Sequence, residues 1–383
     1  MHITEDIRYI GVNDHELDIF EGLYPIPNGM AYNSYVMMDE KIAVMDAVDA
    51  HFGEVWLENL RGVLQDRKPD FLIVHHMEPD HSASIKLFMT TYPDAIVVAS
   101  AKAFPMMKAF FGDDYATQRI IVKEGDILCL GRHTLSFIAA PMVHWPEVLF
   151  SYDTTDKVLF SADAFGKFGA LDVNEEWACE ARRYYFGIVG KYGAQVQSVL
   201  KKAAALNIQT VCPLHGPILT GDALAEALRL YSIWSSYQAE DQGVLIAHAS
   251  VYGNTRAAAE QLADSLQARG VKVTIQDLTR CDIAEAVEDA FRYDRLVLAA
   301  ATYNADVFPP MRNFITWLTE RGYRSRRVGL IENGSWAPMA AKVMRGMLED
   351  CKDLTILDPV VRITSALNPE SAAQLDALAD ALV

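Results

Sequence analysis

Short hydrophobic runs separated by turn residues fill the first 240 positions. Runs expected to form strands include Ile42–Met45, Phe71–Val74, Ala95–Val98, Leu135–Ile138, Val148–Tyr152, Lys157–Phe160 and Thr210–Cys212. Apolar residues recur at helical spacing in Ser82–Thr90, Ala178–Gly190 and Ala194–Leu206. This mixture of helices and neighbouring strands predicts a layered α+β domain over residues 1–240.

From residue 241 onward, strands and helices alternate strictly. The expected strands are Val244–Ala247, Val271–Gln276, Leu296–Ala300, Val328–Ile331 and Thr355–Leu357. The expected helices are Arg256–Arg269, Ile283–Phe291, Pro309–Arg321 and Pro338–Glu349. Five strands with intervening helices predict an α/β domain with a doubly wound parallel sheet over residues 241–383. Asp241–Gly243 follows a helical segment, Gly221–Gln238, and is interpreted as a hinge.

Composition disfavours nucleic-acid-binding, membrane-spanning and secreted proteins. The 383 residues carry 34 basic and 51 acidic side chains, a net charge of −17 that disfavours a nucleic-acid partner. No apolar stretch is long enough to span a bilayer, and the N-terminus lacks the basic start of a secretory signal. Five dispersed cysteines without a CxxC pair indicate reduced thiols, so we expect a cytoplasmic protein without an iron–sulfur or zinc-finger site.

A dense group of metal-binding residue types follows the strand Phe71–Val74. The residues after it read His75-His76-Met77-Glu78-Pro79-Asp80-His81, which is an H-x-E-x-D-H pattern beginning at His76. In an extended segment, a spacing of two directs His76, Glu78 and Asp80 to one side. Pro79 favours that extension through its own φ and through its restriction of Glu78.

Three further candidates follow other strands. His144, Asp163 and His215 each come shortly after a strand, and strand ends of one sheet converge on one edge. We therefore predict two metal ions, with Asp163 as the residue that bridges them. The first ion would be held by His76, Glu78, His144 and Asp163, and the second by Asp80, His81, Asp163 and His215.

Nitrogen and oxygen ligands without a thiolate suit iron, zinc or manganese. A bridging carboxylate stabilises ferric iron during redox cycling, whereas zinc has no redox chemistry. The other histidines stand alone and are expected to be structural; they are His2, His15, His51, His75, His133 and His248.

The first half resembles the metallo-β-lactamase fold, whose usual loop is H-x-H-x-D-H. Glu78 replaces the second histidine, and this departure marks the flavodiiron proteins. The segments Asn28–Tyr35 and Ser161–Gly166 also carry the resemblance. It implies that all seven ligand positions are catalytic and hold two irons per chain.

Three loops of the second half form a candidate cofactor site. The first runs from a strand directly into a helix, where backbone N–H groups and hydroxyls can hold a phosphate. The others follow the third and fourth strands, where ligands of such sheets bind. The loops are Ser250-Val251-Tyr252-Gly253-Asn254-Thr255, Thr302-Tyr303-Asn304-Ala305-Asp306 and Asn333-Gly334-Ser335-Trp336-Ala337.

The aromatic and amide side chains of these loops suit a flat polar ring, and this half resembles flavodoxin, which implies FMN. The two resemblances together cover nearly the whole chain and identify it as similar to the flavodiiron proteins. That family reduces dioxygen to water, nitric oxide to nitrous oxide, or both, with electrons passing from FMN to the di-iron site. The resemblance implies a head-to-tail homodimer, or a dimer of such dimers. We also expect an external electron donor such as rubredoxin.

Two other functions remain open on the sequence. One is a zinc-dependent hydrolase of metallo-β-lactamase fold with a fused flavodoxin, which Glu78 and the FMN loops disfavour. The other is a gas sensor or electron carrier without turnover, for which the sequence offers no output domain.

Overall fold

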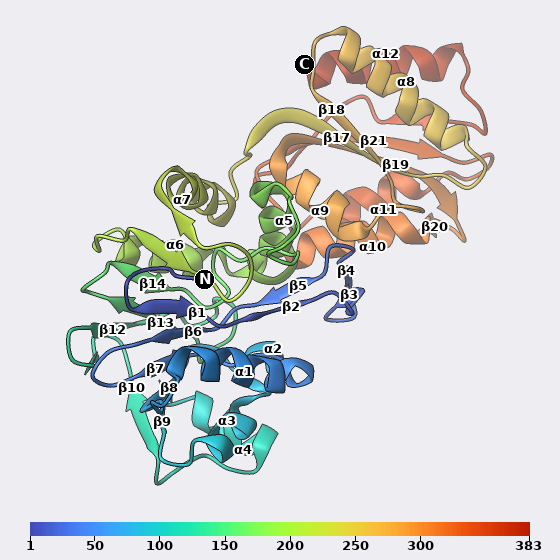
Figure 1. Ribbon diagram of the computed structural model, residues 1–383. Coiled ribbons are helices and arrows are strands. Elements are labelled where there is room, and N and C mark those ends of the chain that lie inside the picture. Colours follow the sequence, from blue (N-terminus) through green and yellow to red (C-terminus); the bar gives the residue numbers. More distant parts are fainter. The chain divides into compact units, whose positions relative to one another are not determined.

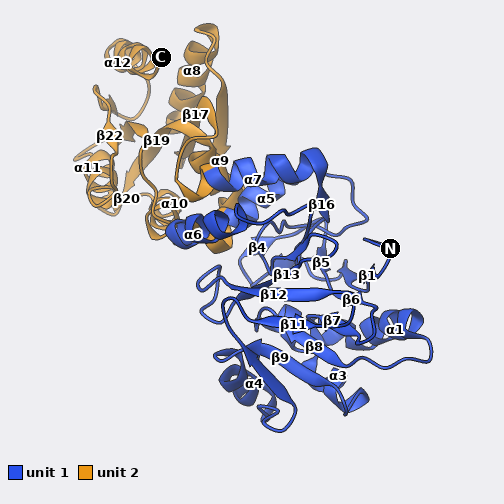
Figure 2. Cartoon of the chain, turned by 90° about the vertical axis from the view of Figure 1, so that its left-hand side faces the viewer, with its two compact units in different colours: residues 1–185, 192–232 blue, residues 186–191, 233–383 orange.

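The computed structural model describes residues 1–383, which form two compact units. Unit 1 contains Met1–Tyr185 and Tyr192–Ser232, and unit 2 contains Phe186–Lys191 and Ile233–Val383 (Figure 2). None of the helices combines the length and the apolar character that crossing a bilayer requires. Each unit is described separately below.

Two six-stranded sheets form the centre of unit 1 (Figure 1). The first has the strand order β1 (Ile7–Tyr9), β6 (Tyr35–Met37), β7 (Ala43–Met45), β8 (Phe71–Val74), β9 (Ile96–Ser100), β10 (Arg119–Val122). The second has the order β11 (Ile127–Cys129), β12 (Thr134–Ala139), β13 (Leu149–Asp153), β14 (Val158–Phe160), β15 (Thr210–Cys212), β16 (Leu219–Thr220). Two small antiparallel pairs accompany them: β2 (Val12–Asp14) with β5 (Met30–Tyr32), and β3 (Ile19–Phe20) with β4 (Tyr24–Pro25).

Helices cover the outer faces of both sheets (Figure 1). The first sheet is flanked by α1 (Gly53–Leu64), α3 (Ile85–Thr91) and α4 (Ala103–Phe111), and the second by α6 (Gly193–Ala203) and α7 (Gly221–Ser235). The remaining helical segments are η1 (Ala50–Phe52), α2 (Pro79–Ser82), α5 (Trp177–Tyr184), the π-helical η2 (Tyr185–Val189) and η3 (Gly190–Tyr192).

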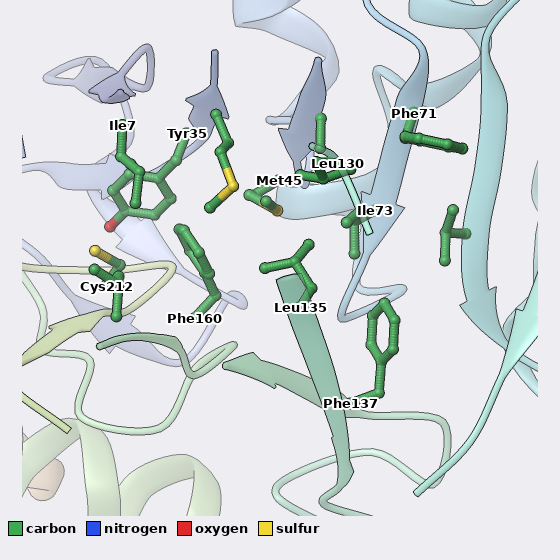
Figure 3. Close-up of a cluster of buried hydrophobic side chains, with 14 of the residues drawn as sticks. Ile7, Tyr35, Met45, Phe71, Ile73, Leu130, Leu135, Phe137, Phe160 and Cys212 are labelled. Atoms are coloured by element: carbon green, nitrogen blue, oxygen red, sulfur yellow. The ribbon is translucent and has the colours of Figure 1, made fainter. Parts of the chain in front are cut away.

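The two sheets pack face to face around one hydrophobic cluster (Figure 3). Met45 and Ile73 of the first sheet meet Phe137 and Phe160 of the second, and all four are at most 2% exposed. Burial of each such side chain contributes roughly 1.5–3 kcal/mol to folding. This core fixes the strands whose ends carry the candidate ligands.

Unit 2 contains one twisted sheet with helices on both faces. Its central path is β18 (Val273–Asp277), β17 (Asp241–Ala249), β19 (Tyr293–Tyr303), β21 (Arg327–Asn333), β22 (Thr355–Ile356). These strands pair in parallel, β23 (Val361–Ile363) also pairs with β21, and the short β20 (Asp306–Val307) pairs antiparallel with β19. The helices are α8 (Asn254–Ala268), α9 (Ile283–Arg292), α10 (Pro309–Glu320), α11 (Ala340–Met347) and α12 (Pro369–Leu382).

The strand order along this sheet, counted in chain order, is 2-1-3-4-5. In such sheets, ligands bind beyond the carboxyl ends of the strands where the order reverses. That point lies between β17 and β19. The fold therefore places the candidate loops after β17, β19 and β21 at one edge.

Several segments differ from the sequence-based expectation. Residues 241–243 belong to β17 rather than to a hinge, because Asp241 pairs with Lys272 and Arg292, each at 2.9 Å. The expected helix Ser82–Thr90 is interrupted between α2 and α3, where the Ser84 N–H bonds the Val48 carbonyl instead. The expected helix Ala178–Gly190 ends as α5 at Tyr184 and continues as π-helical and 3₁₀ turns.

Candidate functional site

The loop after β8 brings four candidate ligands out of the first sheet. The extended segment reaches only as far as Glu78, whose backbone has φ −60° and ψ 138°. Pro79 then begins the single turn α2, as proline at the first helical position commonly does. Asp80 and His81 therefore project from a helical turn, whereas His76 and Glu78 project from the extended segment. The expectation that Asp80 shares one extended face with His76 and Glu78 is wrong.

The other candidates come from the second sheet. His144 follows β12, Asp163 follows β14 and His215 follows β15. The sequence-based expectation placed all these strand ends in a single sheet, and this is wrong because β8 belongs to the first sheet. The two stacked sheets nevertheless bring the seven side chains together.

One group contains His76, Glu78, His144 and Asp163, whose ligand atoms lie within 4.8 Å of one another. The Nε2 atoms of His76 and His144 lie 3.3 and 3.0 Å from Glu78 Oε2. The same two nitrogens lie 3.3 and 3.0 Å from Asp163 Oδ2. Two imidazoles and two carboxylates thus face one point.

The second group contains Asp80, His81 and His215, again within 4.8 Å. The Nε2 atoms of His81 and His215 are 3.0 Å apart, and each lies 3.2 Å from Asp80 Oδ2. Asp163 also reaches this group, because its Oδ1 lies 3.2 Å from His81 Nε2 and 3.9 Å from His215 Nε2. The two oxygens of Asp163 therefore face two different sets of ligands.

The protein provides too few hydrogen bonds for these buried atoms. Asp163 Oδ1 and both carboxylate oxygens of Asp80 are buried and take no hydrogen bond within the chain. Buried polar groups without partners cost free energy, and buried carboxylates are normally paired or bound to a metal. The convergent imidazole nitrogens and carboxylate oxygens form the type of donor set that borderline divalent ions take. The residues fit a pair of metal ions.

The electrostatics of the metal-free chain agree with this fit. Burial opposes a charge on Asp163, yet the neighbouring His76 and His81 hold the pKa of Asp163 well below its usual value. Burial likewise opposes protonation of His144, but its hydrogen bonds with Asp163 and Glu78 raise its pKa to about 9. Positive charge is therefore favoured at the centre of the cluster.

Outer contacts fix the orientation of two ligand imidazoles. His76 Nδ1 donates to Glu147 Oε1 at 2.8 Å, and the Met77 N–H donates to the same oxygen at 2.9 Å. His215 Nδ1 donates to the Ala31 carbonyl at 2.8 Å. These bonds keep the proton on Nδ1 and leave the Nε2 lone pair for a metal. Sequence reasoning missed Glu147, although it stands three residues after His144.

Three of the histidines expected to be structural are buried, namely His75, His133 and His248. His75 is bound through Nδ1 to Asp46 at 2.5 Å and through Nε2 to Ser151 at 2.7 Å. Both nitrogens of His133 contact carboxylates, those of Asp153 and Asp6. The protein itself therefore supplies partners for both ring nitrogens of His75 and of His133.

Two residues near the cluster were not anticipated. Tyr184 is fully buried, with its ring 5.4 Å from that of His215. Glu21 lies at the turn between β3 and β4. Partial removal from water, followed by the nearby Glu78 carboxylate, raises the pKa of Glu21 to about 8. The sequence Phe-Glu-Gly contains no motif that would predict a glutamate close to a metal site.

A cavity of about 530 Å³ lies at the edge of the unit 2 sheet where β17, β19 and β21 end. Fourteen of the sixteen residues predicted to bind the cofactor line it: Ser250, Val251, Tyr252, Asn254, Thr255, Thr302, Tyr303, Asn304, Ala305, Asn333, Gly334, Ser335, Trp336 and Ala337. Its volume is within the range of cofactor sites. Helix α8 begins there without a side-chain cap, so N–H groups of its first turn are available to a phosphate.

The two predicted residues outside the lining have local roles. Gly253 is the residue before α8 and has φ +92°, a conformation that glycine adopts without strain. Asp306 instead forms an ion pair with Arg312. Conversely, Ser365 lines the cavity, and its Oγ donates to Ser335 Oγ at 2.7 Å. Ser365 was missed because β23, which precedes it, was not expected.

Comparisons with known proteins match both halves. A family model described as ODP family beta lactamase matches residues 30–216, and a flavodoxin model matches residues 246–363. The chain is 29% identical over 370 residues to a nitric oxide reductase from Moorella thermoacetica, covering 93% of this chain and 91% of that protein.

Solved structures agree in fold. The flavodiiron protein from Giardia intestinalis superposes with a TM-score of 0.92 at 25% identity, covering 99% of this chain and 95% of that one. Rubredoxin oxygen:oxidoreductase from the anaerobe Desulfovibrio gigas gives a TM-score of 0.91 at 23% identity, covering 100% and 97%. The predicted lactamase-like domain followed by a flavodoxin-like domain is confirmed. The chain belongs to the flavodiiron protein family and is an oxidoreductase.

Proposed function

We propose that this protein reduces dioxygen to water, nitric oxide to nitrous oxide, or both, at a two-iron centre supplied with electrons by FMN. The observation that carries the proposal is the position of Asp163, whose two oxygens face two separate sets of ligands. Relatives named as a nitric oxide reductase and as a rubredoxin oxygen:oxidoreductase support this substrate class.

Seven residues would hold the irons, with Asp163 between them. His76, Glu78 and His144 complete the first position, and Asp80, His81 and His215 complete the second. When bound, the irons supply redox electrons and Lewis acidity, and FMN supplies the electrons that recharge them. The three loops at the edge of the unit 2 sheet would bind FMN, with its phosphate at the start of α8.

The chain's own residues keep the centre ready for turnover. Glu147 and the Ala31 carbonyl hold the Nδ1 protons of His76 and His215, so neither ring needs to change tautomer to bind metal. The ligands other than Glu78 are at most 8% exposed, which limits water at the centre. The three carboxylates offset the positive charge of two metal ions.

The reductions require electrons and protons in fixed ratios. Dioxygen needs four electrons and four protons to give two waters. Two molecules of nitric oxide need two electrons and two protons to give nitrous oxide and one water. We propose an external one-electron donor of the rubredoxin type, which would reduce FMN between turnovers.

We further propose that the working unit is a head-to-tail homodimer, in which FMN of one copy serves the metal centre of the other. Support comes from the rim of the flavin cavity, where Tyr252 is 92% and Trp336 82% exposed. Exposed aromatic side chains around a functional cavity are typical of interfaces. Two variants, one lacking metal ligands and one unable to bind FMN, should regain activity when mixed if electrons cross between copies.

The decisive experiment is the reaction of anaerobically reduced, iron- and FMN-loaded protein with O₂ and separately with NO. Stopped-flow absorbance would follow the reaction, and product analysis under multiple turnover would identify water or nitrous oxide. Sustained turnover with either gas supports the proposal and assigns the preference. Gas binding without turnover would favour a sensor, and bound zinc with esterase activity would favour a hydrolase.

A further inference from the structure

Residues 28–35, one of the segments that carry the family resemblance, contribute no metal ligand, yet they lie directly against one. The segment contains β5 and leads into β6 of the first sheet, whereas His215 follows β15 of the second sheet. The Ala31 carbonyl accepts a hydrogen bond from His215 Nδ1 at 2.8 Å. The ring of Tyr32 stands edge-on to that of His215, with centroids 6.1 Å apart. The two sheets therefore meet at this ligand.

His215 is carried by a short loop, residues 213–216, that belongs to neither β15 nor β16. All four residues are buried, and Pro213 has no N–H to donate. Gly216 has φ +75°, a conformation that glycine adopts without strain. Buried backbone carbonyl groups need hydrogen-bond donors, and a loop without regular structure does not supply them itself. The loop therefore depends on donors from other parts of the chain.

Asn33, at the corner between β5 and β6, supplies three of these donors. Its backbone N–H donates to the Leu214 carbonyl at 2.8 Å. Its side-chain Nδ2 donates to the carbonyls of Pro213 and Gly216, at 2.9 and 2.8 Å. One amide nitrogen thus spans both ends of the loop that carries His215. Asn33 has no exposed surface, and its own Oδ1 takes no hydrogen bond, which costs free energy inside a protein. The side chain is therefore arranged to hold the loop rather than to satisfy all of its own polar atoms.

Two further contacts fix the same loop. Tyr35 Oη donates to the Pro213 carbonyl at 2.6 Å. On the other side, the Leu214 N–H donates to the carbonyl of Ala162, the residue before Asp163, at 2.9 Å. The loop is thereby tied to the start of β6 in the first sheet and to the strand end that carries the bridging carboxylate.

We propose that Asn33 is a positioning residue for the second ligand group, which holds the backbone around His215 so that its Nε2 stays with Asp80 and His81. This inference rests on the metal centre of the proposed function. Asn33 acts on the backbone of a ligand loop, whereas Glu147 acts on the ring of His76 in the other ligand group. The two residues should therefore control the retention of two different irons.

Two substitutions weaken the hold on the loop to different degrees. Asn33→Ala removes both side-chain hydrogen bonds and keeps the one from the backbone N–H. Tyr35→Phe removes a single hydroxyl from a core position and leaves Pro213 with Asn33 as its donor. Because Tyr35→Phe preserves the packing of the ring, it tests the inference even if Asn33→Ala folds poorly.

Two other variants serve as references. Asn59 of α1 also donates from Nδ2 to two carbonyls, those of Ile10 and Gly11, at 3.3 and 3.1 Å. These carbonyls belong to no ligand loop, so Asn59→Ala is the matched control for the loss of two amide hydrogen bonds. Glu147→Gln weakens the hydrogen bond to His76 and marks the iron of the first ligand group.

The test uses the full-length, FMN-loaded protein with two ferrous irons, at a temperature below the melting point of every metal-free variant. Iron release to an excess of a ferrous chelator is timed, and the absorption bands of cobalt(II)-substituted protein report the ligand geometry. Asn33→Ala should release one of the two irons about 10–100-fold faster than the wild type and shift the cobalt bands. Tyr35→Phe should accelerate the same iron by less than about 10-fold, and Asn59→Ala should stay within about twofold.

Combining Asn33→Ala with Glu147→Gln identifies the iron concerned. Each single variant should keep one iron per chain over the period in which the wild type keeps two. The double variant should keep none, because each substitution acts on a different ligand group.

Retention of both irons by Asn33→Ala would overturn the inference. Equal acceleration of both irons would also overturn it, because the substitution would then act through general stability. A double variant that keeps one iron would place both effects at one position and would overturn it as well. A wild-type chain that binds no iron would overturn the proposed function together with this inference, and so the two failures are distinguishable.

Discussion

The metal centre and the flavin cavity differ in the exposure and the charge of the side chains that form them. At the metal centre, His76 and His81 have no exposed surface, and of the seven ligands only Glu78 is not buried, with 15% of its side-chain surface exposed. At the flavin cavity, Tyr252 and Trp336 remain almost fully exposed, and no histidine or carboxylate side chain lines the space. Binding at a buried charged cluster requires every member, because removing one leaves the others without a partner. Binding in an open cavity is shared among many weak contacts. Substitutions should therefore be severe at the first site and graded at the second.

The largest effect is expected from Asp163→Asn. Because Asp163 contributes an oxygen to each ligand group, its loss should remove iron from both positions and lower turnover by roughly 1,000-fold. FMN content should stay unchanged. Iron analysis, flavin absorbance and turnover measure the three quantities, with the exposed Glu226→Gln as control. Retention of both irons in Asp163→Asn would contradict a bridging role.

A smaller effect is expected from Glu147→Gln. The neutral amide oxygen accepts more weakly from His76 Nδ1 than the carboxylate does, so iron affinity should fall about 10-fold. Iron release to a chelator measures the change. Glu124→Gln, which alters a surface carboxylate of the same unit, should have no effect. An equal loss in both variants would mean that the change acts through general charge rather than through His76.

Metal loading should release protons, and its pH dependence has a defined sign. At pH 8 the metal-free chain still carries a proton on His144, whose pKa is about 9, and a metal must displace it. Calorimetry of iron binding in two buffers of different ionisation enthalpy measures this release. Iron binding without proton release would contradict the assignment.

The raised pKa of His144 also affects the stability of the metal-free chain. Its contribution is fully present below about pH 6.5 and is lost as the pH rises through about 9.

The smallest effect is expected at the flavin cavity. Trp336→Ala should weaken FMN binding by about 1 kcal/mol, roughly 5-fold, because one stacking surface among several is lost. Since the side chain is 82% exposed, stability should change by less than about 0.5 kcal/mol. Fluorescence titration with FMN and thermal melting measure the two effects. A loss of bound iron in this variant would contradict the independence of the sites.

The sequence predicted the parts of each site that follow strand ends. His144, Asp163 and His215 each leave a buried strand of the second sheet, so their convergence followed from strand direction alone. The division of ligands between two sheets could not be foreseen, because hydrophobic runs do not reveal which strands pair. The same limit hid β23, a run of three residues, Val361–Ile363, that pairs in parallel with β21.

Residues that act through another residue were the ones missed. Glu147 is a single acid in a segment without periodicity, and its role depends on a contact with His76, 71 positions away. Ser365 likewise reaches the flavin cavity only because β23 pairs in parallel with β21. Such contacts are products of tertiary packing, and no local pattern encodes them.

The spread of the metal ligands along the chain has a consequence for how the protein matures. His81 and His215 touch although 134 positions separate them, and they follow strands of different sheets. Contacts across such long loops form late, because closing the loop costs entropy before any contact offsets it. Iron can therefore not template the fold as zinc does in a small finger domain. Unit 1 should fold first and bind iron afterwards. Only a correctly folded chain would then bind iron, and the bound iron would stabilise that fold further.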